Sequence, residues 1–97
     1  MACSCNDLNK TIKIKKIKEN AKLPTRGSTF AAGYDLYSAN EEPIVIKPNE
    51  TVKIGTGLQM ELPDRTFGAI FARSGLAIKQ GLRPSNCVGV VDADYRR

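Results

Sequence analysis

The sequence predicts an all-β domain of the jelly-roll or a comparable β-sandwich type, with one short helix. Short apolar or alternating segments follow one another along the 97 residues, and turn-forming residues separate them at regular intervals. Only residues 76–80 have helical character, and Gly81 follows them as a typical helix terminator. No repeat or interdomain linker interrupts this pattern. We therefore expect one domain over residues 10–97, preceded by a flexible N-terminus over residues 1–9.

The first strand is expected within residues 10–18, where lysines alternate with isoleucines. Ile12, Ile14 and Ile17 would face a core, and the lysines would face solvent and protect a sheet edge from pairing with other chains. Nucleic acid is the alternative partner for such a basic segment, but no aromatic side chain accompanies the lysines to stack on bases. We therefore favour a solvated strand face and expect no nucleic-acid partner.

The remaining strands are expected wherever β-prone residues lie between turn signals. Asparagine, proline and glycine residues bound these segments, and a helix at residues 76–80 would separate the last two strands. The expected strands cover residues 44–46, 51–54, 57–62, 67–71 and 88–91.

The composition is that of an ordinary globular protein, with 41% hydrophobic residues, 26% charged residues and a formal net charge of +5. No apolar run is long enough to cross a membrane, and the N-terminus lacks the basic start and apolar centre of a secretory signal. These features predict a cytoplasmic protein without a membrane partner. Because 97 residues support only a marginal core, we also expect help from a partner chain.

Three cysteines and the absence of histidine restrict the possible chemistry. Cys3, Cys5 and Cys87 cannot all pair within one chain, so reduced thiols are expected; metal binding or cross-linking by Cys3 and Cys5 is the less favoured alternative. Mechanisms of the Ser-His-Asp or Cys-His type need an imidazole and are excluded. A general base must therefore be a carboxylate or, as a less favoured choice, a lysine or tyrosine.

Two carboxylates stand out at the ends of apolar or small-residue segments. Asp35 lies among residues 31–39, which look buried, and a buried carboxylate is costly unless something pairs with it. Asp92 lies where an apolar strand ends and a turn begins. Each also has a purely structural interpretation, because backbone N–H groups can satisfy Asp35 and Asp92 can stabilise a turn.

A third candidate segment follows the expected strand at residues 67–71. Ser74 and Gly75, at a strand-to-helix transition, can present backbone N–H groups and a hydroxyl to an anion, and Arg73 adds positive charge. The commoner role of such a Ser-Gly pair is to turn the chain and cap a helix.

Taken together, the segments AAGYDLYSA, ARSGLA and GVVDADYR resemble the first three sequence motifs of the trimeric dUTPase family. The similarity runs from about Ile12 to Arg96, and Gly55-Thr56-Gly57-Leu58 followed by Leu62-Pro63 resembles the family's linker between its first two motifs. The resemblance implies a dUTPase-like β-clip or jelly-roll-type barrel that hydrolyses dUTP to dUMP and pyrophosphate and so limits uracil incorporation into DNA. It also implies Mg²⁺ on the triphosphate and a homotrimer whose sites are shared among three subunits.

The resemblance assigns nucleoside-binding roles to four residues of the third motif and its approach. Asp92 would hydrogen-bond the sugar 3′-hydroxyl and activate the attacking water, for which positioning can supply much of the rate that basicity does not. Tyr95 would pack under the deoxyribose and leave no room for a 2′-hydroxyl. Asn86 would contact uracil on a β-hairpin that Gly89 keeps narrow.

The other two motifs are assigned to the phosphates and the metal ion. Arg73, Ser74 and Gly75 match the segment that holds the phosphates in the family. Asp35 matches the acid that orients the metal through its water shell, which suits Mg²⁺ because that ion dehydrates reluctantly.

Two departures from the family pattern limit what is expected of this chain alone. Arg97 stands where the family has a glycine, and the fourth and fifth motifs do not follow. We therefore expect a partial domain, incomplete at the C-terminus, that is impaired in stability and turnover when alone. Two alternatives remain: a non-catalytic nucleotide-binding or regulatory module of the same fold, or a dCTP deaminase relative, although Asn86-Cys87-Val88 lacks the glutamate that a deaminase needs.

Overall fold

The computed structural model describes residues 11–97. The expected N-terminal segment 1–9, with Cys3 and Cys5, lies outside the described residues. The described part of the chain divides into two compact units, one of residues 14–59 and one of residues 60–97 together with 11–13.

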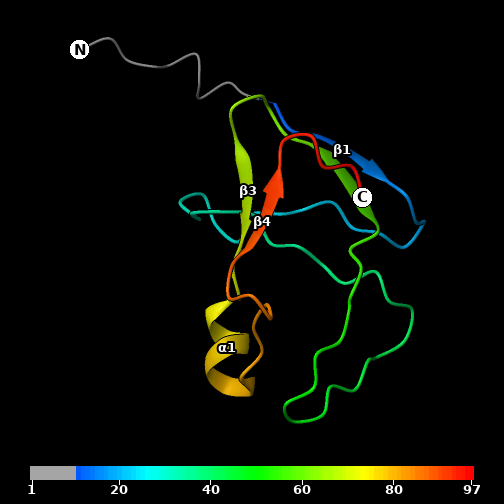
Figure 1. Cartoon of the computed structure of the whole chain (residues 1–97), viewed down its shortest axis with the longest axis vertical. Coiled ribbons are helices and arrows are strands. Elements are labelled where there is room, and N and C mark those ends of the chain that lie inside the picture. Colours follow the sequence, from blue (N-terminus) through cyan, green and yellow to red (C-terminus); the bar gives the residue numbers. More distant parts are fainter. Residues whose placement is uncertain (1–10) are drawn as a thin grey trace. The chain divides into compact units, whose positions relative to one another are not determined.

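The described residues form four short strands and one helix. In chain order these are β1 (Lys13–Lys16), β2 (Leu58–Glu61), β3 (Phe67–Ile70), α1 (Ser74–Gln80) and β4 (Gly89–Asp92) (Figure 1). β1 pairs with β2, and β3 pairs with β4, each pair in a two-stranded sheet. The predicted class, strands with one short helix, is therefore confirmed, although the strands of residues 11–97 do not close into a barrel.

Some expected strands do not form in the described part of the chain. Residues 44–46 and 51–54 have no regular secondary structure, although their sequence alternates suitably. Ile12 and Ile17 are exposed, at 45% and 53%, and only Ile14 of the three isoleucines is partly covered. An alternating pattern shows that a segment can be half-buried, but a strand also needs a neighbour to complete its hydrogen bonds.

The unit of residues 14–59 contains the few side chains that are buried. Ala21 and Ala39 are 3% exposed and Leu58 is 6% exposed, and they are the buried hydrophobic residues among those described. Gly57 lies against them with φ of 70°, and a Cβ atom there would be 2.9 Å from the Cβ of Ala21. Glycine is therefore required at this position both by its backbone conformation and by the close packing. The backbone N–H of Ala39 donates to the Gly55 carbonyl at 2.9 Å and holds the same segment in place.

The unit of residues 60–97 is built on the antiparallel pair β3–β4 (Figure 1). In its register Phe67 lies opposite Asp92, and Ile70 lies opposite Gly89. α1 and the loop after it connect the two strands, and the helix starts two residues before the expected 76–80 and ends at Gln80 as predicted. Gly81 has the left-handed conformation, with φ of 66°, that commonly ends a helix. No helix in residues 11–97 has the length and apolar character needed to span a membrane.

Candidate functional site

The turn after β4 carries the two residues to which the resemblance assigns the sugar and the attacking water. Asp92 is the last residue of β4 and is exposed to solvent. The backbone N–H of Tyr95 donates to the Asp92 carbonyl at 3.0 Å, which closes a turn over residues 92–95. The Tyr95 side chain remains 49% exposed. A carboxylate and an aromatic ring are therefore held near each other on one short turn, and both are accessible to a ligand.

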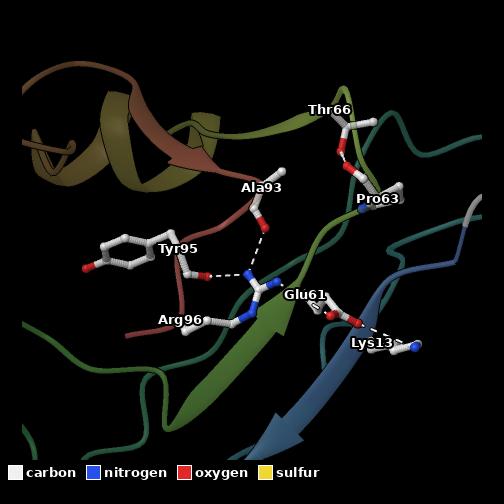
Figure 2. A network of polar contacts seen from close by, with 7 residues as sticks. All are labelled: Lys13, Glu61, Pro63, Thr66, Ala93, Tyr95 and Arg96. Atoms are coloured by element: carbon white, nitrogen blue, oxygen red, sulfur yellow. Dashed lines mark hydrogen bonds and ion pairs between the residues drawn. The ribbon is translucent and has the colours of Figure 1, made fainter.

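Arg96 holds this turn through its guanidinium group, as Figure 2 shows. Its Nη1 atom donates to the Ala93 carbonyl at 2.7 Å and to the Tyr95 carbonyl at 3.0 Å. Its Nη2 atom lies 3.5 Å from Oε1 of Glu61 in β2, and the other carboxylate oxygen of Glu61 lies 3.5 Å from the Lys13 ammonium. Sequence reasoning missed this network, because no local pattern links an arginine to a carboxylate so far away in the chain.

The phosphate-holding segment predicted at residues 73–75 forms the beginning of α1. Arg73 is the N-cap residue with extended backbone, and its carbonyl accepts the N–H of Ala77 at 2.9 Å. Ser74 is the first helical residue rather than the cap, and within the described chain no side chain caps the helix. Ser74 and Gly75 are exposed, and apart from the adjacent residues and the backbone of the helix itself, no heavy atom of the described residues lies within 4 Å of the place that a Cβ of Gly75 would take. The start of the helix, whose first N–H groups lack partners inside a helix, is therefore formed by exposed residues.

The segment predicted to contact uracil is a turn that leads into β4. Asn86 is exposed within this turn, and its carbonyl accepts the N–H of Val88 at 2.8 Å. Cys87 has φ of 69°, a left-handed conformation that is uncommon for a residue other than glycine. Gly89 is the first residue of β4, and a Cβ there would lie 3.3 Å from the Cβ of Ile70. Gly89 therefore permits close pairing with β3, and Asn86 lies in the turn that precedes β4.

Asp35, the predicted metal-orienting acid, belongs to the other unit. Its backbone pairs with that of Thr25 through N–H to carbonyl hydrogen bonds of 2.7 Å and 3.2 Å, which close the loop of residues 26–34. The expectation that Asp35 lies among buried residues is wrong: Ala32, Gly33 and Tyr34 are exposed and Asp35 is half-buried. Small residues allow a loop to run close to its neighbours, but they do not by themselves bury it.

Most of the predicted site residues are exposed, whereas Asp35 and Gly89 are half-buried. The unit of residues 14–59 has an open hollow of about 740 Å³, but its lining comes from residues 18–20 and 39–44. Asp35 is not among the residues that line this hollow.

The register of β3–β4 separates the predicted residues of the other unit into two groups. Asp92 lies at the end of the ladder opposite Phe67, and Gly89 lies at the other end opposite Ile70. Residues 73–75 follow Ile70, so they leave the ladder at the Gly89 end. Strands rise by about 3.4 Å per residue, so the two ends are about 10 Å apart along the strand. The structure therefore brings Asp92 and Tyr95 together and places the phosphate segment beyond the opposite end of the ladder.

Comparison with known proteins shows one family. The family model described as dUTPase matches residues 19–97. The deoxyuridine 5′-triphosphate nucleotidohydrolase of Yarrowia lipolytica is 48% identical over 86 residues, which cover 89% of this chain and 52% of the relative. The chain therefore spans about half the length of the curated relatives that it matches.

Solved structures agree with the sequence comparisons. A mutant dUTPase from phage phi11 of S. aureus superposes with a TM-score of 0.79 at 33% identity, over 90% of this chain and 54% of that chain. That structure describes the coordination of a structural Mg(II) ion. A mutant dUTPase from Staphylococcus bacteriophage 80alpha, solved with dUpNHpp, has a TM-score of 0.80 at 33% identity, over 90% and 49% of the two chains.

Proposed function

The chain belongs to the dUTPase family, and from that premise we propose that it forms part of a site that hydrolyses dUTP to dUMP and pyrophosphate. One structural observation carries the proposal: an exposed carboxylate and a half-exposed tyrosine ring share one turn at the end of β4. Removal of dUTP would limit uracil incorporation into DNA.

Asp92 is the proposed catalytic residue. Its carboxylate accepts hydrogen bonds, so it can bind the sugar 3′-hydroxyl and orient a water molecule in line with the phosphorus to be attacked. A carboxylate is a weak base, but phosphoryl transfer depends mainly on positioning and on electrostatic stabilisation of the phosphate oxygens. The rigid end of a strand suits this role because it restricts where the carboxylate can lie.

Tyr95, Asn86 and Gly89 are proposed to select the nucleoside. A sugar stacked on the Tyr95 ring would bring a 2′-hydroxyl into contact with the ring, so ribonucleotides would be rejected by steric exclusion. Backbone groups of the segment from Asn86 to Gly89 would read the edge of uracil. Cytosine presents a different donor and acceptor pattern and would leave such groups unpaired, which is costly inside a closed site.

Arg73, Ser74 and Gly75 are proposed to hold the phosphates. The guanidinium of Arg73 can make charge-assisted hydrogen bonds to phosphate oxygens, and the exposed start of α1 has N–H groups that lack partners inside the helix. Gly75 supports this role because the chain's own packing does not require a glycine there. A backbone without a Cβ atom lets a phosphate approach closely.

The carboxylates of the described residues could hold Mg²⁺ only if the substrate supplied most of the ligands of the ion. Among residues 11–97 no group of three or more cysteine, aspartate or glutamate side chains could hold a metal ion. Asp35 can orient a Mg²⁺ ion through its water shell, because this ion keeps several waters and needs few protein ligands when phosphates also bind it. When bound, Mg²⁺ would neutralise charge on the triphosphate. The geometry of Asp35 itself depends on its backbone bridge to Thr25.

We further propose that copies of the chain associate, as a homotrimer in the cytoplasm, and that each site is shared between copies. The ladder places Asp92 and residues 73–75 beyond opposite ends, so a site that needs both is more easily built from different copies. Exposed apolar side chains on the same unit support association, because an isolated protein rarely exposes so many. They include Phe67 at 64%, Phe71 at 67% and Ile78 at 83%.

The proposal is tested by incubating the chain with Mg²⁺ and dUTP, dCTP or dTTP while pyrophosphate and ammonia are measured separately. Of the three nucleotides, we expect only dUTP to give pyrophosphate. The Asp92→Asn variant should lower kcat by about 100-fold or more, because an amide is a poor proton acceptor. Glu42→Gln, which makes the same change at an exposed acid of the other unit, should have no effect.

Other outcomes would contradict the proposal. Ammonia released from dCTP would indicate a deaminase. Binding of dUpNHpp without any product from dUTP, both in this chain and in the chain extended with the fourth and fifth family motifs, would indicate a nucleotide-binding or regulatory module instead of a hydrolase.

A further inference from the structure

Arg96 contacts the main chain on both sides of Asp94, within the turn that joins Asp92 to Tyr95. One guanidinium nitrogen, Nη1, donates to the Ala93 carbonyl at 2.7 Å and to the Tyr95 carbonyl at 3.0 Å (Figure 2). Hydrogen bonds from a charged donor are stronger than those between neutral groups. The two contacts therefore restrict the conformations that this turn can adopt.

Glu61 in turn restricts the guanidinium group. Its Oε1 atom lies 3.5 Å from Nη2 of Arg96, and its position in β2 is set by a paired strand rather than by a loop. The second carboxylate oxygen faces Lys13 at 3.5 Å, so the two oxygens of Glu61 interact with different cations (Figure 2). The side chains of Arg96 and Glu61 are about half exposed, at 46% and 49%, so an exposed ion pair of this kind adds little to global stability.

We propose that Arg96, oriented by Glu61, is a positioning residue that sets the distance and angle between the Asp92 carboxylate and the Tyr95 ring. This inference rests on the proposed function, because these two groups are the proposed water-activating and sugar-selecting elements. A planar guanidinium can bind two carbonyls and a carboxylate together, whereas a lysine ammonium lacks that fixed geometry. Misplacement of a reacting group by about 1 Å can lower a rate by about 100-fold.

Substitution of Arg96 tests the inference through both mobility and selectivity. In Arg96→Met, backbone order parameters of residues 93–95 should fall from about 0.85 toward 0.6 in the chain without nucleotide. The kcat/KM for dUTP should fall by about 10- to 100-fold and the preference for dUTP over UTP should decrease. Arg96→Lys should give an intermediate result, and Glu61→Gln a smaller change in the same direction.

Lys13→Met is the matched control, because it removes the other ion pair of Glu61 and leaves the contacts of Arg96 to the turn in place. It should leave mobility, rate and selectivity unchanged. Unchanged order parameters in Arg96→Met would overturn the inference. It would also be overturned if the order parameters of residues 93–95 fell while the enzyme stayed active and its preference for dUTP over UTP did not change.

Absence of dUTP hydrolysis both by this chain and by the chain extended with the fourth and fifth family motifs would contradict the proposed function, and the order parameters alone would then decide the role of Arg96. If Arg96→Met does not fold, Glu61→Gln provides the same two measurements.

Discussion

Asp92 and Tyr95 depend on each other because one turn of the main chain holds both. The hydrogen bond of 3.0 Å between the Tyr95 N–H and the Asp92 carbonyl keeps the tyrosine near the end of β4. Half of the Tyr95 side chain is open to solvent, and stacking of a sugar on the ring would bury apolar surface. In the proposed site the ring would thus contribute both affinity and selectivity, while the carboxylate would act on the water.

Removal of the Tyr95 ring should weaken selection of deoxyribonucleotides. In Tyr95→Ala the space under the sugar opens, so the ratio of kcat/KM for dUTP to that for UTP should decrease by about tenfold or more, a cost typical of losing one steric element in a pocket. Competition assays with the two nucleotides measure this ratio. Tyr95→Phe keeps the ring and should keep the ratio; an unchanged ratio in the alanine variant would mean that the ring does not lie under the sugar.

The position of a residue within a strand was easier to predict than its burial or its backbone conformation. The sequence correctly indicated that Asp92 ends a strand, because the valines before it have high β propensity and the turn follows at once. It did not reveal that Asp35 is only half-buried or that Cys87 adopts a left-handed conformation. Both features depend on the path of the chain around these residues, which local composition does not specify.

At the scale of elements, β3 and α1 place residues 73–75, the proposed phosphate segment, where a strand ends and a helix starts. Residues 71–73 join Ile70 to the first helical residue, and no side chain of the described chain caps that helix. Its first N–H groups are therefore available to an external acceptor, as at many anion-binding helix starts. Gly75 keeps this surface free of a side chain.

A methyl group at Gly75 should therefore affect substrate binding more than folding. In Gly75→Ala the helix should gain up to about 1 kcal/mol, because alanine is the better helix former. The KM for dUTP should rise by about tenfold, a loss of about 1.4 kcal/mol, if the phosphates approach this backbone closely. Thermal unfolding and steady-state kinetics measure the two effects.

Gly55→Ala is the control for this change, because Gly55 also has no atom within 4 Å of its Cβ position but lies outside the proposed site. It should leave the KM for dUTP as it is. A Gly75→Ala variant with an unaltered KM would exclude close contact between the phosphates and the start of α1.

Element boundaries show the limit of pattern reasoning. The end of α1 was predicted because Gly81 provides a local stop signal, whereas residues 44–46 and 51–54 alternate like strands and yet form none. A helix satisfies its hydrogen bonds within one segment, but a strand needs a second segment beside it. The sequence cannot show whether that second segment lies in the same chain.

At the scale of the whole molecule, the described residues bury very little apolar surface for their number. In the described residues the buried hydrophobic side chains are Ala21, Ala39 and Leu58, while Phe30 is 96% exposed and Val90 is 62% exposed. Folded domains of about this size normally bury more than half of the surface that the unfolded chain exposes. Exposure on this scale is expected of a chain that associates with other protein surface.

We therefore expect the folded state to depend on association. Light scattering should give a mass three times the 10.6 kDa of one chain, and the midpoint of thermal unfolding should rise with protein concentration. Val90→Lys, which places a charge on the exposed face of β4, should reduce both the mass and the midpoint. A well-folded monomer at all concentrations would contradict the proposed assembly.

The sequence by itself determined the family and the order of the three motifs, and it predicted the end of β4 and the end of α1. These properties depend on residue types and on short spacings along the chain. Only the tertiary structure decided that Arg96 meets Glu61, that Gly89 packs against Ile70, and that Asp92 lies at the opposite end of the ladder from the phosphate segment. Contacts of this kind join residues far apart in the chain, so they follow from strand pairing and not from any local pattern.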